Sequence, residues 1–380
     1  MSLRTLEIIK DGDRYFDQSV SLIDTAQSEI FIESYIFEFD PIGLKILKAC
    51  SMASKRGLKV WLIIDGVGSF TDAEKIIAFC KSHKISLGIY HPIPFASYFV
   101  IRFNKNSIVR AFHWLKRMNN RNHRKMVIVD GKKALIGSMN VSRVHSEAEM
   151  GTWAWRDSAL LIEGTEIQHL RRAFSLAWKK CRRFNYQKRY LTTQFFDYKL
   201  SEKIFLNYSF RQRFKMNQKV KKFFKEAERR IFLVTPYFIP KGSILRAMHK
   251  ASRNGIDVKL LVPEQSDVYL VKWASYATYA RLLKKGIKIY EYQKSVLHAK
   301  YKIVDDMVWV GSKNMNHRSL VHDLEVEIVE TDMDVVNDFI LQWEHDLSHA
   351  KEISIVEFRK ENSWLYRFFS HIFYWFRYWL

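Results

Sequence analysis

The sequence predicts an α/β protein made of two similar halves, and three observations carry that prediction. First, one motif occurs twice: H-x-K-x4-D, followed after a few residues by G-S-x-N. Second, each copy is preceded by an apolar strand, a helical stretch and another apolar strand, which indicates a duplicated unit. Third, 380 residues with 48% hydrophobic and 27% charged side chains suit two folded domains, each with its own core.

The first half begins with an apolar strand over 31–37, followed by a helical stretch and a second strand over 58–65. Gly57, after a basic pair, fits the end of the intervening helix. Apolar strands joined by a helix are typical of a βαβ crossover in a sheet covered on both faces. The first motif then opens a strand over 125–129, and a turn leads to another over 134–136.

The second half repeats this order. Its apolar strands are expected over 231–238 and 256–262, with Gly255 ending the helix between them. The second motif opens a strand over 300–304, followed by one over 308–310. Its Asp-to-Gly spacing is one residue shorter than in the first copy, which indicates a tighter turn.

The repeat sets the predicted domain organisation. We expect an N-terminal domain over 1–190, a C-terminal domain over 191–350 and a separate tail over 351–380. Packing with pseudo-twofold symmetry would bring the two motifs together at one site between the domains.

Composition restricts the partners and the compartment. A net charge of +22 favours a polyanion such as nucleic acid, an anionic membrane or a phosphate-bearing substrate, without choosing among them. The three cysteines lack the spacing of a disulfide framework or a zinc site, so we expect buried thiols in a reducing compartment. The N-terminus lacks the apolar region of a signal peptide, and no uninterrupted apolar window reaches spanning length. We therefore expect the body of the protein in the cytosol.

The motif pairs a histidine with a lysine two residues later. On a strand, positions i and i+2 share a face, so His123 points with Lys125 and His298 with Lys300. If both pairs meet in one pocket, one imidazole can attack phosphorus while the other protonates the leaving oxygen. Neither step requires a metal or another cofactor, and we expect none.

Other motif positions have supporting roles in this interpretation. Asn140 and Asn314, with the lysines, would bind the non-bridging oxygens of a phosphodiester. Asp130 and Asp305 stand at the far end of each strand and are better interpreted as turn-stabilising carboxylates than as groups that touch substrate. The candidate catalytic set is His123, Lys125, Asp130, His298, Lys300 and Asp305, supported by Ser138, Asn140, Ser312 and Asn314.

The paired motifs resemble those of the phospholipase D superfamily, over about residues 10–345. Within it the chain is most similar to bacterial cardiolipin synthases, in particular the short form without N-terminal membrane helices. Less specific similarities at residues 123–126, 155–164 and 235–238 support that narrower resemblance. It implies two phospholipase D-like α/β/α sandwich domains with the active site at their interface.

The resemblance also implies a mechanism. Family members form a covalent phosphatidyl-histidine, so His123 would attack, and His298 would act first as acid and then as base. A carboxylate on a later strand orients each histidine, and the matching positions here are Asp157 and Glu325. The alternative for Asp157 is simple pairing with its neighbour Arg156.

Two stretches suggest contact with lipid. The segment 364–380 is rich in Trp, Tyr and Phe with interspersed basic residues, a composition typical of an interfacial segment. A terminal helix that closes the core is the alternative. Residues 94–103 and 109–118 alternate apolar and basic blocks, as in a segment that faces anionic lipid at the pocket mouth. An ordinary packed helix is the alternative there.

The hypothesis that follows is a phosphatidyltransferase at the cytoplasmic side of the cell membrane, bound peripherally. It would join two phosphatidylglycerols into cardiolipin and glycerol, with phosphatidylethanolamine as another lipid substrate to consider. A phospholipase D that uses water as acceptor, and a phosphodiesterase nuclease, share the same residues and stay open. A scaffold that only binds lipid is disfavoured because both motif sets are complete, and nucleic acid is not the expected partner.

Overall fold

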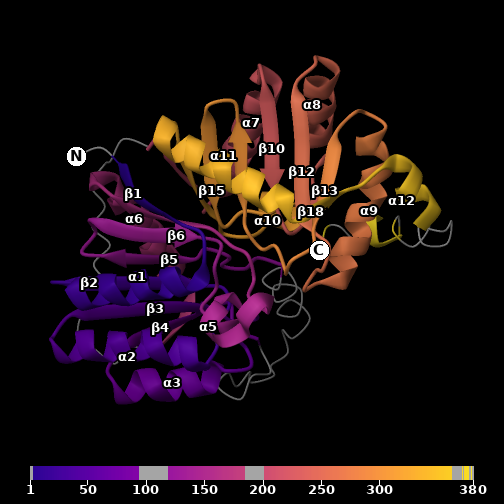
Figure 1. The fold of residues 1–380 in the computed structure, drawn as a ribbon. Helices are drawn as coiled ribbons and strands as arrows, with labels where there is room; N and C mark the ends of the chain where they lie inside the picture. Colours follow the sequence, from indigo (N-terminus) through magenta and orange to yellow (C-terminus); the bar gives the residue numbers. More distant parts are fainter. Residues whose placement is uncertain are drawn as a thin grey trace, which may run out of the picture.

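The computed structural model describes residues 3–93, 119–184 and 201–361, together with residues 370, 372–375 and 378. The predicted lipid-facing stretch up to residue 118 and most of 364–380 lie outside the described residues. Two eight-stranded mixed sheets, with helices packed on them, form this part of the chain (Figure 1).

The first sheet belongs to the N-terminal half. Its spatial order is β1 (Arg4–Ile9), β7 (Ala159–Glu163), β6 (Lys133–Gly137), β5 (Met126–Val129), β2 (Glu29–Ser34), β3 (Lys59–Asp65), β4 (Ser86–Tyr90) and β8 (Cys181–Phe184). β2 and β3 run parallel, and α2 (Pro41–Lys55) connects them. The predicted βαβ crossover is therefore confirmed. Gly57 ends α2 with a φ of 87°, as expected for a left-handed stop.

The second sheet has the same strand order. It reads β9 (Ile204–Leu206), β17 (Val326–Glu330), β15 (Met307–Gly311), β14 (Tyr301–Val304), β10 (Arg230–Val234), β12 (Asp257–Pro263), β13 (Lys288–Tyr292) and β18 (Ala350–Glu352). The duplication expected from the motifs is thus present strand by strand. β18 pairs with β13, so the segment that we expected to be a separate tail from residue 351 begins inside this sheet.

Helices cover the outer face of each sheet. In the first half these are α1 (Gly12–Thr25), α2 and α3 (Ala73–Ser82); in the second they are α7 (Phe210–Glu226), α8 (Gly242–Arg253), α9 (Tyr269–Leu283) and α12 (Ile355–Glu361). Short elements complete the description: η1 (Arg143–His145), α5 (Glu147–Met150), η2 (Gly151–Trp153), η3 (Thr165–Ile167), β11 (Phe238–Ile239), β16 (Met315–Asn316) and α10 (His317–Val321).

The inner faces of both sheets share one core. α6 (Gln168–Trp178) and α11 (Met333–Ser348) contribute to it. On α11, Val336, Phe339 and Trp343 follow the helical period and are all buried, so one stripe of the helix faces the sheets. This continuous core fixes one half against the other, which lets residues from both halves form a single site.

Candidate active site

Backbone bridges between the halves position both motif histidines. His123 lies just before β5, and its N–H donates to Leu324 O at 3.0 Å. In the same way the N–H of His298 donates to Arg156 O at 2.8 Å. Each histidine is therefore held beside the residue that precedes a carboxylate of the opposite half, Glu325 or Asp157.

The histidine–carboxylate pairs are crossed between the halves. His123 Nδ1 lies 3.0 Å from Glu325 Oε1, and His298 Nδ1 lies 2.7 Å from Asp157 Oδ2. The serine of each G-S-x-N sequence, Ser138 or Ser312, donates its hydroxyl hydrogen bond to the carboxylate of its own half. Two serine–carboxylate–histidine chains thus converge from opposite sides.

The crossed pairs decide against the alternative that Asp157 simply pairs with its neighbour Arg156. Arg156 binds the carboxylate of Asp346 with two hydrogen bonds of 2.9 Å, and it reaches only the backbone oxygen of Asp157. The Asp157 side chain is left to accept from the Ser138 hydroxyl, the Ser158 backbone N–H and His298. Because the carboxylate accepts a hydrogen bond from Nδ1 of His298, the ring proton lies on that nitrogen. Nε2 of His298 is then available for chemistry.

Both histidines are neutral in this environment. Burial lowers the pKa of His298 to about 3, and the Lys300 ammonium group adds to the effect. Burial also holds the pKa of His123 well below its usual range, with a further contribution from Lys125. An anionic phosphate between the two rings would favour protonation of one of them.

The two carboxylates differ in charge state. Burial acts to raise the pKa of Asp157, but the facing His298 outweighs it and the net pKa lies below the usual range. For Glu325, burial dominates and raises the pKa to about 7. Asp157 is therefore firmly ionised near neutral pH, whereas Glu325 titrates there.

Each motif lysine is hydrogen-bonded to the backbone oxygen of its motif histidine. Lys125 Nζ donates to His123 O at 2.7 Å, and Lys300 Nζ donates to His298 O at 2.6 Å. Lys300 Nζ also lies 3.0 Å from His298 Nε2. Burial lowers the pKa of Lys300 to about 8, so its charge is retained at neutral pH but is easily lost above it.

A cavity of about 320 Å³ connects the two histidines. His123 and His298 both line it, so the prediction that the motifs meet at one site between the halves is confirmed. Asn140 and Asn314 line it as well, and Asn314 Oδ1 has no hydrogen-bond partner among the described residues. Its other lining residues include Tyr35, Trp155, Tyr237 and Arg318.

Asp130 and Asp305 are not brought into this cavity. The Asp130 carboxylate accepts hydrogen bonds from the backbone N–H groups of Gln27, Ser28 and Glu29 at 2.8 to 3.1 Å. Asp305 does the same for residues 228–230. Both have positive φ values, near 50°, at the turn after the motif strand. Their geometry agrees with the interpretation as turn-stabilising carboxylates.

The glycine before each motif serine permits a close strand approach. A Cβ on Gly311 would lie 2.1 Å from Val326 O, which is backbone and cannot turn away. We expect Gly311→Ala to lower the free energy of unfolding by about 1–3 kcal/mol, because β15 and β17 must separate. Gly242→Ala is the matched control, since its Cβ would meet only the end of Arg246 at 3.4 Å. Urea denaturation of both variants checks this, and equal stabilities would contradict it.

Several residues at the site were not identified from the sequence. The His123 ring lies edge-on to Tyr35 at 5.1 Å between centroids, and Trp155 lies 5.4 Å from the His298 ring. Arg318 adds a cation to the cavity wall. His145, the fifth residue after Asn140, faces Asp157. Only the fold brings these residues together. Trp155 stands two positions before Asp157 in the sequence, which is a partial signal for its place at the site.

His145, Asp157 and His298 offer metal-ligand atoms that all lie within 4.8 Å of one another. A divalent cation does not suit this triangle, because the Lys300 ammonium is 3.0 Å from His298 Nε2 and would repel it. The backbone N–H of Asn140 occupies the other nitrogen of His145. The cluster is better described as two imidazoles around one carboxylate, with His298 hydrogen-bonded to Asp157 at 2.7 Å and His145 Nδ1 at 3.4 Å from it.

Two α/β halves whose H-x-K motifs meet at one cavity define a phospholipase D-like enzyme. The family described as "Cardiolipin synthase, PLD-like domain" matches residues 20–178 and 220–347. The chain belongs to this family.

Relatives agree with this assignment, and a solved structure agrees with the fold. A cardiolipin synthase 1 of Staphylococcus aureus is 31% identical over 350 residues, which cover 90% of this chain and 67% of the relative. A probable cardiolipin synthase of Bacillus subtilis is 28% identical over 93% of this chain and 68% of its own. The fold resembles the phosphatidylserine synthase of Haemophilus influenzae, with a TM-score of 0.72 at 13% identity over 98% of this chain and 93% of that one.

Proposed function

We propose that this chain is a cardiolipin synthase, which transfers a phosphatidyl group from one phosphatidylglycerol to the hydroxyl of another. The observation that carries this proposal is the meeting of two histidine–carboxylate pairs at one cavity between the halves. Family membership and the cardiolipin synthases among its relatives support the choice of lipid substrate.

The first step forms a covalent intermediate. His123 Nε2 attacks phosphorus and a P–N bond forms, while the P–O bond to the glycerol headgroup breaks. His298, which is protonated at Nε2 once the anionic substrate is bound, gives this proton to that oxygen, so free glycerol leaves. The ionised Asp157 stabilises the protonated state of His298, which supports the acid role for this histidine.

The second step returns the enzyme to its starting state. The hydroxyl of the second phosphatidylglycerol attacks phosphorus, His298 takes its proton, and the P–N bond to His123 breaks. Cardiolipin is the product. Lys125, Lys300 and the amides of Asn140 and Asn314 stabilise the charge on the non-bridging oxygens in both steps.

A product assay tests this function. Purified protein with vesicles of labelled phosphatidylglycerol should yield cardiolipin and glycerol in equal amounts. Phosphatidic acid as the main product would make the enzyme a phospholipase D. Cleavage of plasmid DNA without turnover of lipid would make it a nuclease. Vesicles with phosphatidylethanolamine show whether that lipid also enters the reaction.

The charge states of the site predict a bell-shaped pH dependence. Attack by His123 requires the Glu325 carboxylate, whose pKa is raised to about 7, so kcat/KM should rise as pH increases to that value. Phosphate binding requires the Lys300 ammonium, whose pKa is lowered to about 8, so the rate should fall above that value. Lys300→Arg keeps its charge and should remove the alkaline limb. An unchanged alkaline limb in this variant would contradict the assignment.

We also propose that the enzyme binds the membrane beside this cavity. Val268 lines the cavity, and the next residue, Tyr269, is 76% exposed at the start of α9. Trp375 is 79% exposed, and nearby Phe373 packs on Trp273 of α9. Aromatic side chains at a cavity mouth suit the headgroup depth of a bilayer. Among the described residues no helix has the length and hydrophobicity to cross one.

Charge substitutions at this surface should weaken vesicle binding. Tyr269→Glu and Leu270→Glu each remove one apolar anchor. Each single variant should lose about a factor of ten in affinity for phosphatidylglycerol vesicles. Met52→Glu, a comparably exposed apolar position on α2, is the control and should bind as the parent does. Vesicle sedimentation checks this. The proposed surface would be contradicted if the α9 variants bound vesicles as tightly as Met52→Glu does.

A further inference from the structure

The two halves differ at one position that contacts the carboxylates. The seventh residue after the motif serine is His145 in the first half and Ser319 in the second. Ser319 is buried and donates a hydrogen bond to Glu325. His145 is also buried, and its Nδ1 lies 3.4 Å from Asp157 Oδ2. The duplicated site therefore contains one imidazole without a counterpart in the other half.

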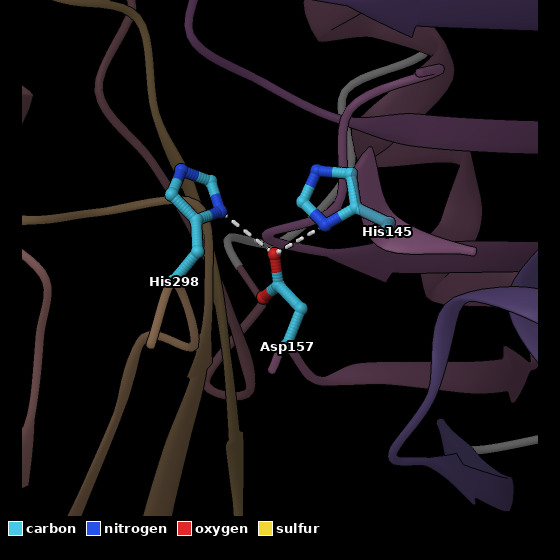
Figure 2. A group of neighbouring side chains, drawn as sticks. All are labelled: His145, Asp157 and His298. Carbon is cyan, nitrogen blue, oxygen red and sulfur yellow. Dashed lines mark hydrogen bonds and ion pairs between the residues drawn. The ribbon is translucent and has the colours of Figure 1, made fainter. Parts of the chain in front are cut away.

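His145 is held in one orientation and one tautomer. The backbone N–H of Asn140 donates to its Nε2 at 3.2 Å, which leaves the ring proton on Nδ1, toward Asp157. Its backbone is fixed by α1, because even a Cβ on Gly12 would lie 1.9 Å from His145 O. Figure 2 shows His145 and His298 turned toward the same oxygen of Asp157.

We propose that His145 is a positioning residue that keeps Asp157 ionised and aligned on His298, and so assigns the acid–base role to His298. Two similar imidazoles face the substrate, and their carboxylate partners make them unequal. Asp157 faces two imidazole nitrogens, at 2.7 and 3.4 Å, together with the Ser138 hydroxyl and the Ser158 backbone N–H, whereas Glu325 faces one imidazole and two hydroxyl groups. A carboxylate with more donors is a stronger stabiliser of the nearby imidazolium.

His145 acts as a neutral imidazole in this role, with its Nδ1 directed at Asp157. Burial lowers its pKa to about 4, and the lysines Lys300 and Lys125 oppose its protonation further, although Asp157 favours it. Its outer side borders a second cavity of about 450 Å³, whose other titratable groups are Lys10, Asp11, Glu147, Arg156, Tyr292, Lys294 and His345. None of the hydrogen bonds described for His145 involves those groups, so its interaction with Asp157 is the one that bears on catalysis.

The test uses the dependence of the reaction on its leaving group, and it rests on the proposed phosphatidyl transfer. Glycerol needs a proton from His298 in order to leave, whereas p-nitrophenolate does not. We expect His145→Ala to slow glycerol release from phosphatidylglycerol about 10- to 100-fold. The burst of p-nitrophenol from phosphatidyl-p-nitrophenol should stay near the parent rate.

His145→Asn is the conservative variant. Its amide N–H can occupy the place of Nδ1–H, so it should recover most of the lost rate of glycerol release. His145→Phe keeps the ring volume without an N–H and replaces the alanine variant if that one does not fold. It should show the same selective loss, with thermal melting as the check on folding.

Three results would overturn the proposal. They are an unchanged rate of glycerol release, an equal loss with both leaving groups, or an asparagine variant as slow as the alanine variant. Glycerol release is the same whether the acceptor is a lipid or water. A failure of the cardiolipin assignment therefore appears only in the product analysis and leaves this test intact.

Discussion

Replacing His123 by alanine should lower phosphatidyl transfer by a factor on the order of 10⁴ or more, with both glycerol and p-nitrophenol as leaving groups. The reason is that the P–N bond cannot form without this imidazole, whatever the leaving group. The loss corresponds to about 5.5 kcal/mol of transition-state stabilisation. The measurement is the p-nitrophenol burst together with steady-state release of glycerol.

His298→Ala is the matched comparison for His123→Ala, because both remove a buried imidazole from the same cavity. This variant should fail on phosphatidylglycerol but still give a p-nitrophenol burst, since that leaving group needs no acid. The intermediate should then persist, because no base activates the acceptor. A burst in the His123 variant and none in the His298 variant would reverse the two roles.

Removing the charge of either carboxylate should have the next largest effect on the rate. Asp157→Asn keeps the size of the side chain but can present an amide N–H to His298 Nδ1, which favours the wrong tautomer. We expect a loss of about 10²- to 10⁴-fold in kcat, as for other carboxylates that orient a catalytic imidazole. Glu325→Gln should act on His123 in the same way.

The crossed geometry gives these carboxylate variants a distinctive signature. Asp157 belongs to the N-terminal half, yet its loss should reproduce the leaving-group selectivity of the His298 variant from the other half. Glu325→Gln should instead resemble His123→Ala, with both leaving groups affected. Asp130→Asn is the control within the motif. It should lower the melting temperature through lost turn hydrogen bonds, with kcat per folded molecule retained. Pairing within each half would give the opposite selectivities.

The sequence predicted the duplicated α/β architecture well, because the relevant signals are local. Apolar runs of strand length, a glycine after each crossover helix and two identical motifs lie within short windows of the chain. The structure shifts the first strand of the crossover from 31–37 to Glu29–Ser34 but leaves its partner almost unchanged. The placement of Asp130 at the end of a strand also followed from counting positions.

The crossed pairing of the site was not predictable by the same means. It depends on the backbone bridge between Asn122 and Leu324 and on the one between Arg156 and Leu297, which join distant parts of the chain. The partners of the histidines had been identified as Asp157 and Glu325, but not which carboxylate faces which ring. His145 carried no local signal, because its importance appears only when loops after G-S-x-N in the two halves are compared in space.

Mapping the covalent intermediate tests most directly the claim that two unequal histidines share one phosphatidyl transfer. Parent protein and the His298→Ala variant would be mixed with labelled phosphatidylglycerol or phosphatidyl-p-nitrophenol, quenched in alkaline denaturant and digested for mass spectrometry. We predict the phosphatidyl group on His123, with more of it in the His298 variant treated with the p-nitrophenyl substrate. A label on His298 in the parent, or on neither histidine while cardiolipin accumulates, would contradict this mechanism.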